Sequence, residues 1–214
     1  MMKPDHCDML TQMQQAAYAK LLWASAQPKS LSVLVGPGGV GKTLIGKLMA
    51  SDARVDGICK MIDADAIDNT RNFLPDGACI ILVDNAHKIE AVTLSLIFKS
   101  IEFSETVRRA LILIGQGRLL TLLHRQPEIE RAVRIRAVLL PWSFEETTQQ
   151  VVLHLGESAV SDEAIEIIHE SSAGVPAAVL NVLELAKILI ASLARPLDGH
   201  DMEKLVGRLR LIAA

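Results

Sequence analysis

Over the first 142 residues, continuous apolar runs alternate with segments in which apolar residues recur every three or four positions. The continuous runs predict buried β-strands, and the second pattern predicts amphipathic helices. Strands that alternate with helices are typical of a parallel sheet with helices on both faces. We therefore expect an α/β fold with five strands, at 31–35, 58–62, 78–83, 110–114 and 137–140.

Helices are expected before and between these strands. The first covers 8–26 and ends before Pro28, and its apolar residues lie on one side: Leu10, Met13, Ala17, Leu21 and Leu22. A second helix is expected to start over 44–50, and others to cover 91–103, 118–124 and 128–134.

The pattern changes after residue 142, where only helices are expected, over about 143–155, 161–172, 175–194 and 199–211. This change predicts two domains: residues 1–142, with the N-terminal helix and the α/β sheet, and a small helical domain over 143–214. The most apolar run, 179–194, is interrupted by Asn181, Glu184 and Lys187. These three residues recur at helical spacing and predict a polar edge on a buried helix rather than a membrane span.

Composition and charge argue against some classes of function. The net charge is -3 and aromatic residues make up 3% of the chain, so neither a strongly basic surface nor a base-stacking platform is expected. The three cysteines show no CxxC spacing, which argues against a disulfide or zinc framework. The first residues lack the apolar core of a signal peptide, and we expect a cytoplasmic protein.

A phosphate-binding loop follows the first predicted strand and precedes a predicted helix. It matches GxxxxGK[ST] without interruption and consists of Gly36, Pro37, Gly38, Gly39, Val40, Gly41, Lys42 and Thr43. Small residues let successive backbone N–H groups curl around phosphates, and the helix N-terminus adds a partial positive charge. We expect the loop to bind ATP, with Lys42 on the β- and γ-phosphates and the Thr43 hydroxyl on Mg²⁺.

The third predicted strand ends in Asp84, as in a Walker B motif, where a carboxylate holds Mg²⁺ directly or through water. In many ATPases of this type the next residue is a Glu that orients the attacking water, but here it is Asn85. An amide can hydrogen-bond a water but cannot accept its proton. Either hydrolysis is slow or another group serves, with His87 and Glu90 as candidates, although His87 is more simply a residue at a helix entry.

Two further groups are candidates for sensing or completing the site. Gln116 follows the fourth predicted strand and is expected to contact the γ-phosphate, unless it belongs to an ordinary strand-to-helix turn. Four residues, which we call the arginine cluster, precede the fifth predicted strand: Arg125, Arg131, Arg134 and Arg136. They are either a source of an arginine finger that reaches a neighbouring subunit, with Arg131 and Arg134 favoured, or a solvated basic helix face with a nucleic-acid contact.

The order of these motifs resembles that of the AAA+ ATPases, and the resemblance spans roughly residues 15–210. It is carried by the phosphate loop, 80–87, 113–116 and Gly174-Val175-Pro176 followed by Asn181. The chain is most similar to the group of the secretion-associated ExeA/GspA ATPases and the TniB and MuB transposition ATPases. This implies a P-loop NTPase with a helical lid over 143–214. Relatives carry a cation after Gly-x-Pro where this chain has Ala177 and Ala178, which favours a weak ATPase or a nucleotide-dependent switch.

The resemblance implies that the chain binds ATP and Mg²⁺, forms homo-oligomers with ATP, and recruits or remodels an unidentified protein partner in secretion or in a DNA transaction. Two alternatives stay open. One is an ATP-dependent scaffold that does not hydrolyse ATP. The other is a regulator related to DnaA, since some of these carry Asp-Asn at this strand end and since 127–131 is similar to their arginine-finger region.

Overall fold

The computed structural model describes residues 10–52, 58–67, 78–102 and 110–212, which form two compact units. The first unit contains the residues up to Leu139, except for the loop residues Gly38–Val40. The second unit contains those three loop residues and the chain from Leu140 onward.

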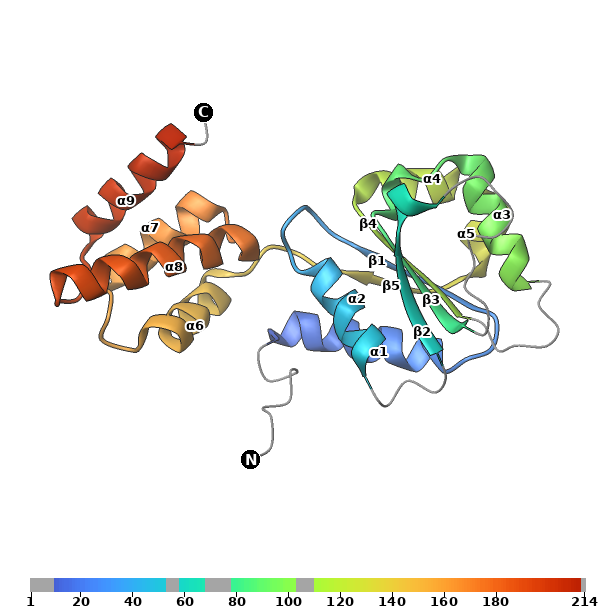
Figure 1. Ribbon diagram of the computed structural model, residues 1–214, viewed down its shortest axis with the longest axis horizontal. Coiled ribbons are helices and arrows are strands. Elements are labelled where there is room, and N and C mark those ends of the chain that lie inside the picture. The colour runs from blue at the N-terminus through green and yellow to red at the C-terminus, as the bar shows by residue number, and fades with distance from the viewer. Residues whose placement is uncertain (1–9, 53–57, 68–77, 103–109, 213–214) are drawn as a thin grey trace. The chain divides into compact units, whose positions relative to one another are not determined.

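Five parallel strands form the sheet of the first unit, in the order β2-β3-β4-β1-β5 (Figure 1). The predicted α/β fold with a parallel five-stranded sheet is therefore confirmed. β1 and β4 lie in the middle and are buried along their whole length, which explains their continuous apolar sequences. The strands are β1 Ser30–Val35, β2 Ile58–Asp63, β3 Ala78–Asp84, β4 Ala110–Gly115 and β5 Val133–Val138.

Helices cover both faces of this sheet (Figure 1). α1 (Gln12–Ser25) and α2 (Lys42–Ser51) pack on one face. On the other face lie α3 (Ala91–Glu102), α4 (Gly117–His124) and α5 (Pro127–Ala132), with the short 3-10 turns η2 (Ala64–Ala66) and η3 (Ala86–Lys88) at the strand ends. The core under α3, α4 and α5 is built from alternate strand residues and the apolar sides of these helices, among them Val33, Ile81, Leu113, Leu94, Ile97, Leu119 and Ile129.

The fifth strand differs from the prediction. The helix expected over 128–134 ends at Ala132, and the strand expected over 137–140 begins at Val133 and ends at Val138. The physical reason is the position of β5 at the edge of the sheet. Half-buried Val133 and Ile135 alternate there with exposed Arg134 and Arg136, so the strand has a period of two instead of the apolar run of a central strand.

The second unit is helical from α6 onward, with α6 Phe144–Leu155, α7 Asp162–Ser172, α8 Pro176–Leu193 and α9 Gly199–Ile212. Ser143 and Glu146 form a capping box at the start of α6, and Ser161 caps α7. The Trp142 N–H donates to the Gly174 carbonyl oxygen at 2.7 Å. A Cβ at Gly174, whose φ is +66°, would lie 2.2 Å from the Trp142 carbonyl oxygen, so only glycine fits there.

Among the described helices, α8 alone is long and apolar enough, by length and composition, to cross a membrane. One side of α8 packs in the core of the second unit, through Val179, Leu183 and Ala186. On its exposed side, Glu184 and Lys187 form an ion pair at 2.8 Å, in keeping with the predicted polar edge. A core helix of a soluble protein meets the same criterion of length and composition, and 28% of α8 is buried within the protein.

Candidate functional site

The phosphate loop lies at the carboxyl ends of the central strands, an edge of the sheet that we call the phosphate-loop edge. β1 ends at Val35, and β3 and β4 end at Asp84 and Gly115. Because the strands are parallel, their carboxyl ends share this edge. The Gly36 N–H donates to the Gly115 carbonyl oxygen at 3.3 Å, which ties the start of the loop to the end of β4.

Two glycines give the loop its shape. Gly39 and Gly41 have φ values of +77° and +94°, which side chains rarely tolerate. Gly41 is also the N-cap residue of α2, and a Cβ there would lie 2.7 Å from Nε2 of Gln14 on α1. The backbone N–H groups of the first turn of α2 therefore follow directly on a loop that bends as an anion cradle requires.

Lys42 and Asp84 are charged residues that the fold buries at this edge, with 9% and 6% of their surfaces exposed. The Lys42 ammonium donates to the Pro37 carbonyl oxygen within the loop. Burial lowers the pKa of Lys42, and the nearby Asp84 carboxylate opposes that effect. The Thr43 hydroxyl donates to Asp84 Oδ2 at 2.7 Å, so the predicted metal-binding pair is in contact.

Asn85 does not point toward the loop. It has a left-handed backbone with φ +54°, and its N–H donates to Asp84 Oδ1 at 2.9 Å. Its side-chain Nδ2 donates to Oδ2 of Asp63, at the end of β2, at 2.8 Å. The sequence motifs do not single out Asp63, although it follows a predicted strand just as Asp84 does.

The remaining predicted residues of this edge are close in the fold but make few contacts. His87 lies in η3, and its Nδ1 is buried without a hydrogen-bond partner among the described residues. Burial, followed by the charges of Lys88 and Lys42, lowers the pKa of His87. Glu90 is exposed in the turn before α3. Gln116 follows β4 as the N-cap residue of α4, with an exposed side chain that makes no capping hydrogen bond.

The arginine cluster lies elsewhere on the first unit. Arg131 lies in the last turn of α5, Arg134 and Arg136 lie on the edge strand β5, and all three are exposed. Arg136 forms an ion pair with Glu130 at 3.2 Å. Arg134 is near the amino end of β5, about 13 Å along the strand from the phosphate-loop edge at a rise of about 3.3 Å per residue. Arg134 is thus not brought into the loop's site by its own strand, and Arg131 precedes that strand.

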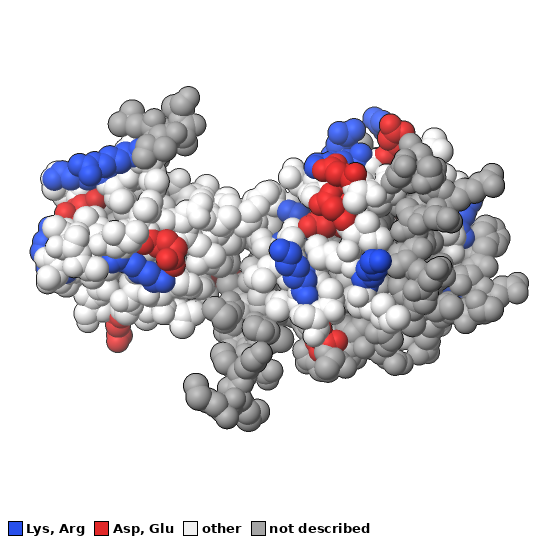
Figure 2. Space-filling view, viewed as in Figure 1, with Lys and Arg blue, Asp and Glu red and all other residues white. Residues whose placement is uncertain are grey.

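Surface charge does not single out a basic face in the view of Figure 2. There, Lys and Arg side chains of the described residues alternate with Asp and Glu in small groups. An acidic residue also sits within the arginine cluster, because Glu130 binds both Arg136 and His124. This mixture of signs weakens the interpretation of the cluster as a simple DNA-binding surface.

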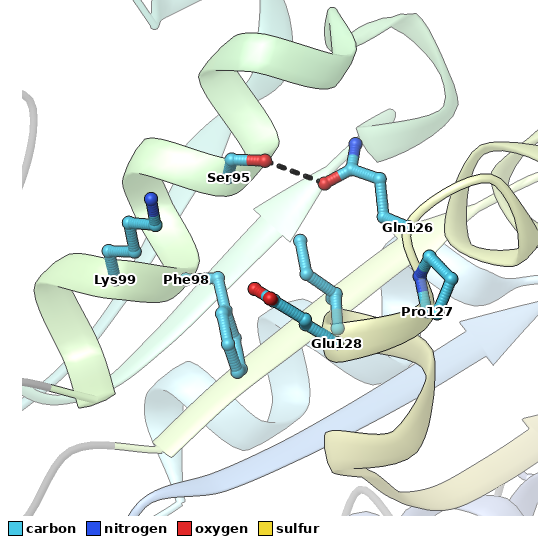
Figure 3. A pocket seen from close by; sticks show the side chains of 7 residues that line it. Ser95, Phe98, Lys99, Gln126, Pro127 and Glu128 are labelled. Atoms are coloured by element: carbon cyan, nitrogen blue, oxygen red, sulfur yellow. Dashed lines mark hydrogen bonds between the residues drawn. The ribbon is translucent and has the colours of Figure 1, made fainter.

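A surface pocket of about 350 Å³ lies between α3 and α5, away from the phosphate loop (Figure 3). Ser95 donates to Gln126 Oε1 at 2.7 Å across it, and Lys99 and Glu128 lie on opposite sides. The residues that line it come from α3, α5 and the turn before α5, and no predicted site residue is among them. The pocket therefore adds nothing to the nucleotide chemistry.

No protein-family model and no curated protein matches the chain by sequence. Solved structures do match its fold. The RuvB Holliday junction branch migration motor of Thermotoga maritima is 16% identical, with a TM-score of 0.69 over 94% of this chain and 70% of that one. A mutant of the same RuvB is also 16% identical, and its TM-score is 0.72 over 98% of this chain and 74% of the RuvB chain.

The ORC2 protein of Aeropyrum pernix is also similar in structure. It is 15% identical, with a TM-score of 0.60 over 91% of this chain and 66% of its own. Together with the sheet described above, these similarities show that the chain has the fold of the AAA+ P-loop ATPases. At such low sequence identity these similarities show the fold only, and the activity has to be argued from the residues of the site.

Proposed function

We propose that this chain binds ATP with Mg²⁺ at the phosphate-loop edge. The observation that carries the proposal is the contact of the Thr43 hydroxyl with the Asp84 carboxylate, at the N-terminus of α2 and directly after a loop with two left-handed glycines. Hydroxyl and carboxylate oxygens are the ligands that Mg²⁺ prefers when phosphates complete its shell. No group of three or more His, Cys, Asp or Glu in the described parts of the chain offers a different metal site.

Each residue of the loop has a defined task in this proposal. The backbone N–H groups of the loop hold the phosphates, and Lys42 exchanges the Pro37 carbonyl for the β- and γ-phosphate oxygens. Thr43 and Asp84 hold the metal ion, which supplies neutralisation of phosphate charge when bound. Gln116, which follows the neighbouring β4, responds to the γ-phosphate in this proposal.

We further propose that ATP binding drives assembly of copies of the chain and recruitment of a protein partner in the cytoplasm. Support comes from the AAA+ fold and from the exposed Arg131 and Arg134, which suit a neighbouring subunit better than their own loop. The RuvB of Thermotoga maritima is a Holliday junction branch migration motor, and a role in a DNA transaction is therefore the first pathway to test. Secretion, as in the ExeA/GspA group, and DnaA-like regulation are the others.

A second candidate function is an ATP-dependent scaffold without hydrolysis. The specific observation in its favour is that Asn85 replaces the usual Glu and binds Asp63 with its side chain. ATP binding without phosphate release at any protein concentration, with or without DNA, would favour the scaffold over a weak ATPase.

Equilibrium binding of ATP in the presence of Mg²⁺ tests the proposed site. Lys42→Ala is expected to weaken ATP binding about 100-fold, because it removes a charge-assisted contact from a buried position. Lys47→Ala is the matched control, since Lys47 lies on α2 but is exposed, and it should bind ATP as the unmodified chain does. Absence of ATP binding by the unmodified chain would overturn the proposal.

A further inference from the structure

Two acidic residues at the phosphate-loop edge are joined through Asn85. Asp63 and Asp84 are Cα partners at the ends of the parallel strands β2 and β3, so their side chains leave the same face of the sheet. The Asn85 N–H donates to Asp84 Oδ1 at 2.9 Å, and its Nδ2 donates to Asp63 Oδ2 at 2.8 Å. Asp84 in turn accepts from Thr43, and a continuous hydrogen-bonded chain runs from the phosphate loop to Asp63.

The geometry points to Asp63 as the carboxylate that orients the water attacking the γ-phosphate, with Asn85 as the residue that positions it. This inference deepens the proposed function and rests on it. The carboxylate stands at the end of β2, and the amide stands after Asp84, where many ATPases of this type carry a Glu. Asn85 reaches Asp63 because its left-handed backbone turns the side chain toward β2.

Asp63 keeps the capacity that this role needs. Its Oδ1 accepts the Asp65 N–H at 2.9 Å and its Oδ2 accepts from Asn85, which leaves a lone pair on each oxygen for a water. The Asp65 N–H, aided by the Asn85 amide and the charge of Lys88 and opposed by burial, lowers the pKa of Asp63. The carboxyl group is therefore ionised at neutral pH and can accept a hydrogen bond from water.

In the step itself, the water oxygen forms a bond to the γ-phosphorus. The bond from that phosphorus to the bridging oxygen breaks, and its electron pair stays on ADP. Asp63 accepts the proton of the water and releases it to solvent. Because the transition state of phosphoryl transfer is loose, orientation of the water matters more than the strength of the base.

The competing explanation is that Asp63 only caps η2, through its contact with the Asp65 N–H. Asparagine caps a helix as well as aspartate does, so Asp63→Asn preserves the cap but removes the charge and the second acceptor oxygen, which receives the Asn85 amide. We expect Asp63→Asn to lower single-turnover phosphate release about 100-fold while ATP binding stays unchanged. Asp65→Asn is the matched control, because Asp65 is an exposed neighbour whose side chain pairs with Lys88, and it should retain turnover.

The double variant Asp63→Asn/Asn85→Asp restores one acid and one amide in the reverse order, and it should regain at least a tenth of the turnover. Unchanged turnover in Asp63→Asn, or no recovery in the double variant despite normal ATP binding, would overturn the inference. The inference would also be wrong if the unmodified chain binds ATP but releases no phosphate, although the proposed ATP binding would then still hold. If the unmodified chain does not bind ATP at all, the proposed function itself is overturned.

Discussion

Two groups of charged residues border the same sheet and differ in how the fold holds them. At the phosphate-loop edge, Lys42 and Asp84 are buried, and Thr43 and Asn85 hydrogen-bond Asp84 from both sides. In the arginine cluster, Arg131 and Arg134 are exposed and form no ion pair with another residue in the described ranges. The first group is organised by its own chain, whereas the second has long side chains left for a ligand or a neighbour to order.

This difference separates the effects that substitutions should have. A preorganised site loses affinity when one of its members is removed, because the other members remain buried and unpaired. Exposed arginines that act on a neighbouring molecule should change turnover or assembly and leave the affinity of a single chain for ATP as it was.

The arginine cluster provides the largest expected effect. Arg131→Ala and Arg134→Ala should each be tested for a loss of about 1,000-fold in ATP turnover by the assembled protein, the low end of what an arginine finger contributes. Only the residue that reaches the neighbouring γ-phosphate should show it, and neither should alter ATP binding. Turnover at saturating ATP and oligomer size with Mg-ATP measure this.

The exposed Arg208 of α9 serves as the control, and Arg208→Ala should retain turnover. If instead the cluster binds DNA, each variant should reduce the slope of log affinity against log salt by about 0.9 per lost phosphate contact. Weaker ATP binding by the isolated chain in either variant would contradict the division drawn above.

The second prediction compares the stability that a buried strand, β3, and an edge strand, β5, contribute to the sheet. Ile81, on β3, is fully buried under α3 and α4, whereas Ile135, on the edge strand β5, is half-buried. Ile81→Ala should lower the free energy of unfolding by about 3 kcal/mol, because it removes apolar contact and leaves a cavity. Ile135→Ala should cost about 1 kcal/mol. Urea denaturation of both variants measures the difference, and equal losses would show that the two strands support the fold alike.

The same contrast explains what could be predicted from the sequence. Central strands have continuous apolar sequences and could be located, and the phosphate loop could be identified because its eight residues are contiguous. β5 was misplaced because an edge strand alternates apolar and charged residues, and a short segment of this kind also fits a helix. Asp63 was missed because its partner Asn85 is 22 positions away, and the register of β2 with β3 brings them together.

The third prediction concerns the metal-binding pair at the phosphate-loop edge. Thr43→Val keeps the shape of the side chain but removes the hydroxyl that binds Asp84. Hydrogen bonds to charged groups contribute about 1.5–3 kcal/mol, so ATP affinity with Mg²⁺ should fall about 10- to 100-fold. Affinity measured with EDTA should change much less. Thr43→Ser keeps a hydroxyl and should bind Mg-ATP nearly as the unmodified chain does. Equal losses of Mg-ATP affinity in the Thr43→Val and Thr43→Ser variants would show that the hydroxyl does not bind the metal ion.

The smallest expected effect lies at Glu130, the acidic residue that pairs with Arg136 of the arginine cluster. Glu130 contacts Arg136 at 3.2 Å and His124 at 3.2 Å, and both partners are substantially exposed. Exposed ion pairs contribute about 0–1 kcal/mol, since water screens the charges and the side chains lose freedom. Glu130→Gln should therefore lower the free energy of unfolding by less than about 1 kcal/mol, and the difference should shrink in about 1 M salt, where the screening length is about 3 Å. A larger, salt-insensitive loss in chemical denaturation would mean that the cluster is organised by its own chain after all, as the phosphate-loop edge is.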